Sequence, residues 1–178
     1  MTGTEYNRNA LTALLEKVRS MPEEKDYDAL VKSYTEGTMT EAEGLQEGQN
    51  IGNYAFFKYS GLTSVSFPQS IGSIGIAAFK GSGLAGRLKL NCTEICEQAF
   101  QGCTGLTRVW ISSLCTSIIA SSYGNAPFLN CSDRIQIYAE ASAAPEGWGS
   151  CYDNIASDTK TDVIFGMSEA EFDAIQEG

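Results

Sequence analysis

Cysteines and carboxylates are the side chains of this sequence that could perform chemistry, because the chain contains no histidine. Histidine is the commonest general base and the commonest metal ligand in proteins. Its absence excludes Ser-His-Asp hydrolysis, Cys-His proteolysis and zinc sites with histidine ligands. We therefore expect no catalytic residues, no cofactor and no enzymatic activity.

The chain has six cysteines, namely Cys92, Cys96, Cys103, Cys115, Cys131 and Cys151. The Cys92-x-x-x-Cys96 spacing is not that of a zinc ribbon, so no metal site is expected. The N-terminus shows no secretory signal, which favours free thiols in a reducing compartment. A disulfide between neighbouring parts of the fold stays open if the protein ends outside a cell.

The carboxylates and glycines also lack a pattern that predicts a site. The acids cluster at positions 23, 24, 26 and 28 and again at 153, 158 and 162, without the spacing of a calcium loop. A solvated acidic surface is the expected role. Gly75, Gly81 and Gly83 do not form a nucleotide-binding motif and are expected to turn the chain.

Charge is distributed unevenly along the 178 residues, whose formal net charge is −10. Residues 1–50 carry ten acids and five bases, residues 51–139 carry three acids and six bases, and residues 140–178 carry nine acids and one base. A mildly basic middle thus lies between two acidic ends. Nucleic-acid binding is not expected, because it requires a strongly basic domain.

An internal repeat in the middle of the chain must position these residues. Ile51, Ile74 and Ile95 are each followed five residues later by a phenylalanine, and a looser copy runs from Ile118 to Phe128. The starting isoleucines are 23, 21 and 23 residues apart. Self-similarity at this period predicts a solenoid in which each coil contains a strand and a helix-like turn.

Each copy contains one alternating run that predicts a strand, at residues 62–67, 84–90, 106–111 and 134–138. Aligning the runs predicts two inward columns of apolar residues. The first column is Val65, Leu88, Val109 and Ile135, and the second is Phe67, Leu90, Ile111 and Ile137.

The repeat resembles the BspA-like leucine-rich repeats. The resemblance rests on Ile51-Gly-x-x-Ala55-Phe56 and on the stretch from Ala99-Phe100 through Cys103 and Leu106 to Val109. It implies an α/β repeat fold, a short solenoid of about four coils with parallel strands, over residues 50–139. It also implies protein binding or surface adhesion, with Cys103 and Cys131 as buried core thiols.

Two flanking regions are expected to cap the solenoid. Residues 1–49 form an acidic N-terminal cap, with a helical hairpin over residues 7–35 predicted from the apolar spacing that begins at Leu11. Residues 140–178 form an acidic C-terminal cap with a strand and a terminal helix. The helix is predicted by the capping box that begins at Ser168.

The outward strand positions are the candidate binding site. The alignment places Arg87, Arg108 and Arg134 in one ladder, flanked by Lys89, Trp110 and Tyr138. Arginine beside an exposed tryptophan is typical of binding hot spots. Neighbouring like charges are unfavourable, so an acidic group should compensate them. The alternatives are a solvated face, or one neutralised by the acidic ends of the chain.

The favoured function is a non-catalytic interaction or adhesion scaffold that binds protein partners or an acidic or glycan surface. No run approaches the roughly 18 apolar residues of a membrane span. The chain is expected to be cytoplasmic at synthesis. It would then be part of a multi-subunit assembly such as a phage or prophage particle, released by lysis. The alternatives are an intracellular regulator or effector and an exported surface adhesin.

Overall fold

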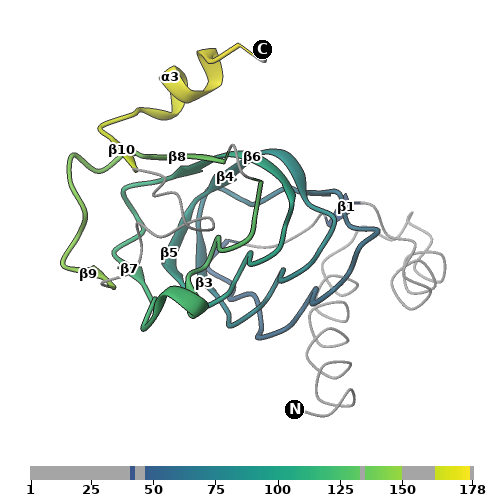
Figure 1. The fold of residues 1–178 in the computed structure, drawn as a ribbon. Helices are drawn as coiled ribbons and strands as arrows, with labels where there is room; N and C mark the ends of the chain where they lie inside the picture. The colour runs from purple at the N-terminus through teal and green to yellow at the C-terminus, as the bar shows by residue number, and fades with distance from the viewer. Residues whose placement is uncertain (1–40, 43–46, 133–134, 150–162, 177–178) are drawn as a thin grey trace.

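The computed structural model describes residues 41–42, 47–132, 135–149 and 163–176. The helical hairpin predicted over residues 7–35 lies outside these residues, as do Arg134 and Cys151. Within them, short strands recur at the period of the sequence repeat and pair in parallel (Figure 1).

The strands form three parallel sheets, which follow two sides of the coils. One four-stranded sheet contains, in spatial order, β3 (Ile71–Ile74), β5 (Cys92–Ile95), β7 (Ser117–Ile118) and β9 (Gly147–Trp148). The other contains β10 (Ile164–Phe165), β8 (Gln136–Ala139), β6 (Gly105–Ile111) and β4 (Ala85–Leu90). The two-stranded sheet pairs β1 (Glu41–Ala42) with β2 (Ser64–Val65). A 3-10 helix covers Tyr123–Asn125.

The parallel sheets extend beyond both ends of residues 50–139. The earliest pair joins Glu41 to Ser64, and β9 and β10 add strands after residue 139. The predicted count of about four coils is therefore too low. The flanking strands escape the sequence pattern because their coils lack the Ile-to-Phe spacing of the central copies.

The repeated phenylalanines form a continuous stack through the core. Phe56, Phe79, Phe100 and Phe128 follow one another with ring centroids 5.1, 5.3 and 5.3 Å apart and nearly parallel planes. All four are buried, together with the repeated isoleucines. The five-residue spacing from isoleucine to phenylalanine thus places one aromatic ring per coil in the same column.

The turns around the stack recur with the same backbone conformation. Seven residues after the leading isoleucine, successive coils place Lys58, Gly81 and Gly102 at φ values of 56°, 68° and 75°. This left-handed region suits glycine, which has no Cβ to clash with the backbone. Two of the three coils therefore carry the residue that the turn requires.

The register of the fourth strand differs from the predicted one. Val109 pairs with Ile137 and Ile111 with Ala139, whereas the alignment placed Ile135 beside Val109. The inward residue lies nine positions after the stacked phenylalanine in every coil, from Phe56 to Val65 and from Phe128 to Ile137. Counting from the phenylalanine predicts this strand correctly, because the stacked ring sets the start of each coil.

The C-terminal segment runs over the outer face of the β4–β6–β8 sheet. After β10 the chain turns and forms helix α3 (Glu169–Ala174), which lies outside the solenoid in Figure 1. The predicted capping box is present: Ser168 Oγ accepts from Glu171 N, and the Glu171 carboxylate accepts from Ser168 N. The helix therefore begins where the sequence predicts it.

Candidate functional site

The outer face of strands β4, β6 and β8 carries five of the six predicted binding residues. Arg87 and Lys89 lie on β4, Arg108 and Trp110 on β6, and Tyr138 on β8. The register pairs Arg108 with Gln136, so the predicted ladder of three arginines is wrong. It contains two, Arg87 and Arg108, because the fourth strand is shifted by two residues.

Helix α3 buries the aromatic part of this face. Trp110 is 2% exposed and Tyr138 is 5% exposed, so the expectation of an exposed tryptophan is wrong. The indole Nε1 of Trp110 donates to the Met167 carbonyl over 2.8 Å. The Phe172 ring contacts Tyr138 edge-on, with 5.5 Å between the ring centroids. Trp110, Tyr138 and Phe172 form a hydrophobic cluster that is separate from the core of the solenoid.

Arg87 holds the C-terminal end of the helix. Its guanidinium carbon lies 4.3 Å from the centroid of the Phe172 ring. Its two terminal nitrogens donate to the carbonyls of Phe172 and Ile175, the latter over 2.9 Å. A cation is favourable there because the last carbonyls of a helix carry partial negative charge. Arg87 therefore combines stacking on an aromatic ring with charge-assisted hydrogen bonds.

Lys89 holds the acidic side of the helix. Its ammonium group lies 2.8 Å from the Glu169 carboxylate and 3.1 Å from that of Asp173. The hydrogen bond to Glu169 is the main cause that raises the pKa of Lys89 above its ordinary value. All three side chains are more than one third exposed, and exposed ion pairs contribute little to stability. The acidic C-terminal segment thus supplies carboxylates to the basic face.

Arg108 has a weaker connection than its neighbour. Its Nε donates to Gln136 Oε1 over 3.4 Å, and the Tyr138 hydroxyl donates to the same oxygen over 3.0 Å. Gln136 therefore joins a cation and an aromatic hydroxyl. Sequence alignment missed this role because it assigned Gln136 to the wrong position of the strand.

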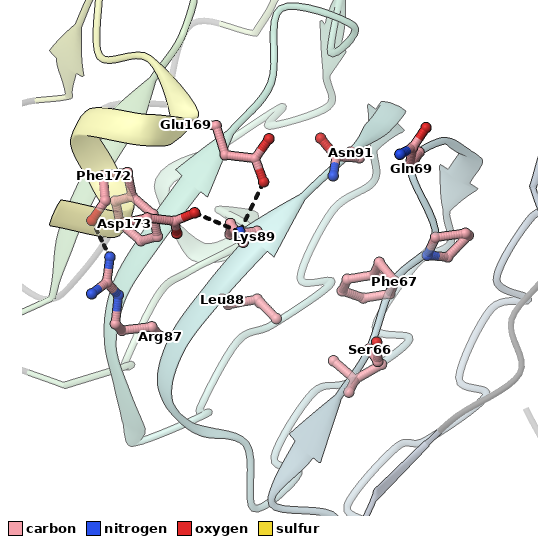
Figure 2. Close-up of a pocket in the computed structure, with 12 residues that line it drawn as sticks. Ser66, Phe67, Gln69, Arg87, Leu88, Lys89, Asn91, Glu169, Phe172 and Asp173 are labelled. Atoms are coloured by element: carbon pink, nitrogen blue, oxygen red, sulfur yellow. Dashed lines mark hydrogen bonds and ion pairs between the residues drawn. The ribbon is translucent and has the colours of Figure 1, made fainter.

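A cleft of about 360 Å³ lies beside the helix. Figure 2 shows Phe172, Glu169 and Asp173 of α3 on one side and the segment from Ser66 to Gln69 on the other, with β4 between them. Its residues are Val65, Ser66, Phe67, Pro68, Gln69, Arg87, Leu88, Lys89, Asn91, Glu169, Phe172 and Asp173. The volume falls within the usual range of ligand pockets, roughly 300–1,000 Å³.

The cleft opens where β2 and β4 separate. Ala85 N donates to Thr63 O over 3.1 Å, and beyond this bond no backbone hydrogen bond links residues 65–69 to β4. β4 is consequently an edge strand in the described part of the chain. Pro68 contributes to the opening because it has no N–H to donate to a neighbouring strand. No role was predicted for this proline from the sequence, although a proline is the kind of residue that interrupts a sheet.

The free edge of β4 presents main-chain groups to the cleft. Leu90 O accepts from Ser112 N on the β6 side over 3.0 Å. In a parallel strand, the main-chain N–H and C=O groups of alternate residues bond to opposite neighbouring strands. The main-chain groups of Leu88 and Leu90 therefore point toward β6, whereas those of Arg87 and Lys89 point toward the cleft. Among the described residues, no strand pairs with the N–H and C=O groups of Arg87 and Lys89 on that side. They can pair with an extended peptide.

The described cysteines have structural surroundings. Cys92, Cys96, Cys103, Cys115 and Cys131 are free thiols, and all but Cys96 are buried. Cys103 and Cys131 donate from Sγ to the carbonyls of Phe79 and Phe100, over 3.1 and 3.2 Å. Burial raises the pKa of Cys103 to about 11. Among the residues that the structure describes, no group of histidine, cysteine and acidic side chains could hold a metal ion.

Comparison with known proteins identifies the repeat. The family profile of the BspA type Leucine rich repeat region matches residues 32–139 in six copies. No curated protein and no solved structure shows a significant match to the chain. Within the described ranges, no helix is both long and apolar enough to cross a membrane.

Proposed function

Because the chain belongs to the BspA-type leucine-rich repeat family, we propose that it is a non-catalytic scaffold that binds an extended segment of a partner protein. The proposed site is the cleft between the segment 65–69 and strand β4. Leucine-rich repeats suit interaction and adhesion, because stacked coils present a long, regular surface.

The observation that carries this proposal is the free edge of β4. In the central coils each strand of this sheet lies between two neighbours, as β6 lies between β4 and β8. At the cleft the ladder stops at the bond between Ala85 and Thr63. A peptide strand beside Arg87 and Lys89 would restore the missing pairing. Main-chain bonds would supply affinity and the flanking side chains would supply specificity.

The lining of the cleft supports a polypeptide as its occupant. Val65, Phe67 and Pro68 are partly exposed and provide apolar contacts, whereas Gln69 and Asn91 offer amide groups near the rim. The positive charges of Arg87 and Lys89 in the lining are balanced by the negative charges of Glu169 and Asp173. A largely uncharged extended segment fits this combination better than a strongly acidic ligand.

Two tryptophan substitutions test the proposal. Ser66 is exposed and lines the cleft, whereas Ser64, two residues earlier in the chain, is exposed and lies outside it. The tagged full-length chain is purified from its native source in each form, and bound proteins are quantified by mass spectrometry. Ser66→Trp should reduce recovery of the partner at least tenfold, and Ser64→Trp should leave it unchanged. Equal recovery with both variants would refute the site.

The same purification also tests the localisation of the protein and the assembly to which it belongs. We infer from the interaction fold that it belongs to a larger assembly, and a phage or prophage particle remains the favoured candidate. A mass measurement of the native complex should then give a multi-subunit particle. A complex with one cytosolic protein would instead indicate a regulator or effector, and enrichment at the cell surface would indicate an adhesin.

A further inference from the structure

The outer face of β4, β6 and β8 already holds a short helical peptide, which is α3 of the same chain. We propose that this face is a receptor for an acidic segment with an aromatic anchor from a partner protein, and that α3 occupies it until such a segment displaces it. This inference rests on the proposed interaction function. Because Glu169, Phe172 and Asp173 of α3 also line the cleft, displacement of α3 opens one side of it, and the two partner segments are not expected to bind at the same time.

The chemistry of the face defines the segment that it accepts. The anchor is Phe172, which is 1% exposed and lies between the ring of Tyr138 and the guanidinium of Arg87. The acids Glu169 and Asp173, three residues before and one residue after the anchor, both pair with Lys89. A partner segment should therefore carry an aromatic residue with acids at these two spacings.

The residues on the receptor side are those that dominate binding energies. Tryptophan, tyrosine and arginine are enriched in interaction hot spots. Here Trp110 donates to a main-chain carbonyl of the incoming segment, Tyr138 contacts its anchor, and Arg87 binds its last carbonyls. Two of these three contacts involve main-chain atoms, so other sequences with the same anchor and acids can make them.

The helix can leave without disturbing the solenoid. The cluster around Phe172 is separate from the cluster that contains the phenylalanine stack. Helix α3 has six residues, and isolated helices shorter than about 12–15 residues are not stable in water, so its conformation depends on the face. The pairs with Lys89 are exposed and are weakened by salt, which lowers the barrier to exchange.

A labelled peptide that covers residues 163–178 is the probe, and its binding to full-length protein is followed by fluorescence anisotropy. The Phe172→Ala protein has lost its own anchor and should bind the peptide at least tenfold more tightly than the wild-type protein. A peptide with Phe172→Ala has the same charge and should not bind. Equal binding of both peptides, or no binding to the variant protein, would overturn the proposal.

Circular dichroism shows whether Phe172→Ala impairs folding. If it does, variants that reverse the charges of the ion pairs with Lys89 test the proposal instead. Glu169 and Asp173 are exposed, so a full-length protein with Glu169→Lys and Asp173→Lys should fold, release α3 and bind the wild-type peptide. A second full-length protein with Lys89→Glu alone should release α3 by like-charge repulsion, bind a peptide with the same two lysines and not bind the wild-type peptide. Failure of this exchange of specificity would refute the recognition by charge.

The segment that binds the outer face of β4, β6 and β8 could instead be α3 of a second copy of the protein. Sedimentation of the wild-type protein distinguishes this case, because exchanged helices would produce dimers at high concentration. The proposal expects a monomer across the concentration range. A dimer that Phe172→Ala abolishes would assign the face to self-association and overturn the assignment to a foreign partner.

Discussion

Arg87 and Arg108 occupy paired positions on the neighbouring parallel strands β4 and β6, yet the two guanidinium groups have different partners. Arg87 donates to the carbonyls of Phe172 and Ile175, whereas Arg108 donates to Gln136. Like charges at paired positions of a sheet repel each other. Helix α3 therefore supplies the hydrogen-bond acceptors for one arginine, and a glutamine of the next coil supplies the acceptor for the other.

Substitution of Arg87 should release the helix. Arg87→Ala removes the contact with the Phe172 ring and two charge-assisted hydrogen bonds, together worth about 1–3 kcal/mol in a partly exposed site. Trp110 should become accessible to acrylamide, measured in a Trp148→Phe background. Arg108→Ala is the matched control and should leave the quenching of Trp110 nearly unchanged, because Arg108 contacts Gln136 rather than the helix.

Acid should loosen the start of α3 through Glu171. Hydrogen bonds from Ser168 lower the pKa of the Glu171 carboxyl below its ordinary value of 4.5. A lowered pKa means that the carboxylate supports the folded state above pH 4.5, and that this support is lost as the pH falls through the lowered value. Wild-type protein should therefore show increasing acrylamide quenching of Trp110 in acid.

Glu171→Gln isolates this contribution. Glutamine can accept the same hydrogen bond in a capping box but does not titrate in acid. Glu169, Asp173 and Lys89 are unchanged in the variant, so a difference between the two proteins reports on Glu171. The variant should thus have a shallower acid dependence than the wild type. Identical pH profiles would contradict a role for the cap.

The aromatic stack should dominate the stability of the solenoid. Phe100 is fully buried between Phe79 and Phe128, so Phe100→Ala should lower the free energy of unfolding by about 3–5 kcal/mol. Urea unfolding measures the change. Phe57→Ala, at a partly exposed ring outside the stack, is the control and should have a distinctly smaller effect.

The repeated turn predicts a stabilising substitution. Lys58 has a φ of 56° where the following coils have Gly81 and Gly102. Lys58→Gly should raise the free energy of unfolding by roughly 0.5–1 kcal/mol, because glycine adopts this conformation without a steric penalty. Gly81→Ala, at a φ of 68°, should lower it by a similar amount. Shifts of the urea midpoint in the same direction for both variants would contradict this explanation.

Cys96 should react slowly although it is partly exposed. Burial, with the negative charge of Glu94 as the next cause, raises the pKa of the Cys96 thiol to about 11. At pH 8 its thiolate population is then on the order of a hundredfold below that of an ordinary cysteine, whose pKa is about 8.5. The rate at which Cys96 reacts with a thiol reagent, measured in a Cys151→Ser protein, reports this population. Glu94→Gln should increase that rate, and an unchanged rate would contradict the effect of the Glu94 charge.

The repeat and its core could be predicted from the sequence because both depend on local spacing. The intervals from Ile51 to Phe56 and from Phe56 to Val65 recur in the central coils, and stacking converts each repeated position into a column. The capping box at Ser168 was equally visible, since its hydrogen bonds join residues three positions apart. The family assignment follows from the same periodic positions.

The candidate binding face could be predicted from the sequence only in part. Arg87, Lys89, Trp110 and Tyr138 were identified as outward residues of one sheet, and the structure brings them together. Their role as a binding site for a partner stays a prediction. Arg134 was included through an alignment error of two residues, because the irregular fourth copy offered two apolar positions, Ile135 and Ile137, for the same column.

What the sequence determined by itself is therefore the central coils with their inward columns, and the start of the last helix. Tertiary structure alone decided that α3 buries Trp110 and that the sheet opens between β2 and β4. The contact of Phe172 with Arg87 joins residues 85 positions apart, and no local period encodes such a distance. It depends on the path of the chain after the last repeat, which only the folded molecule defines.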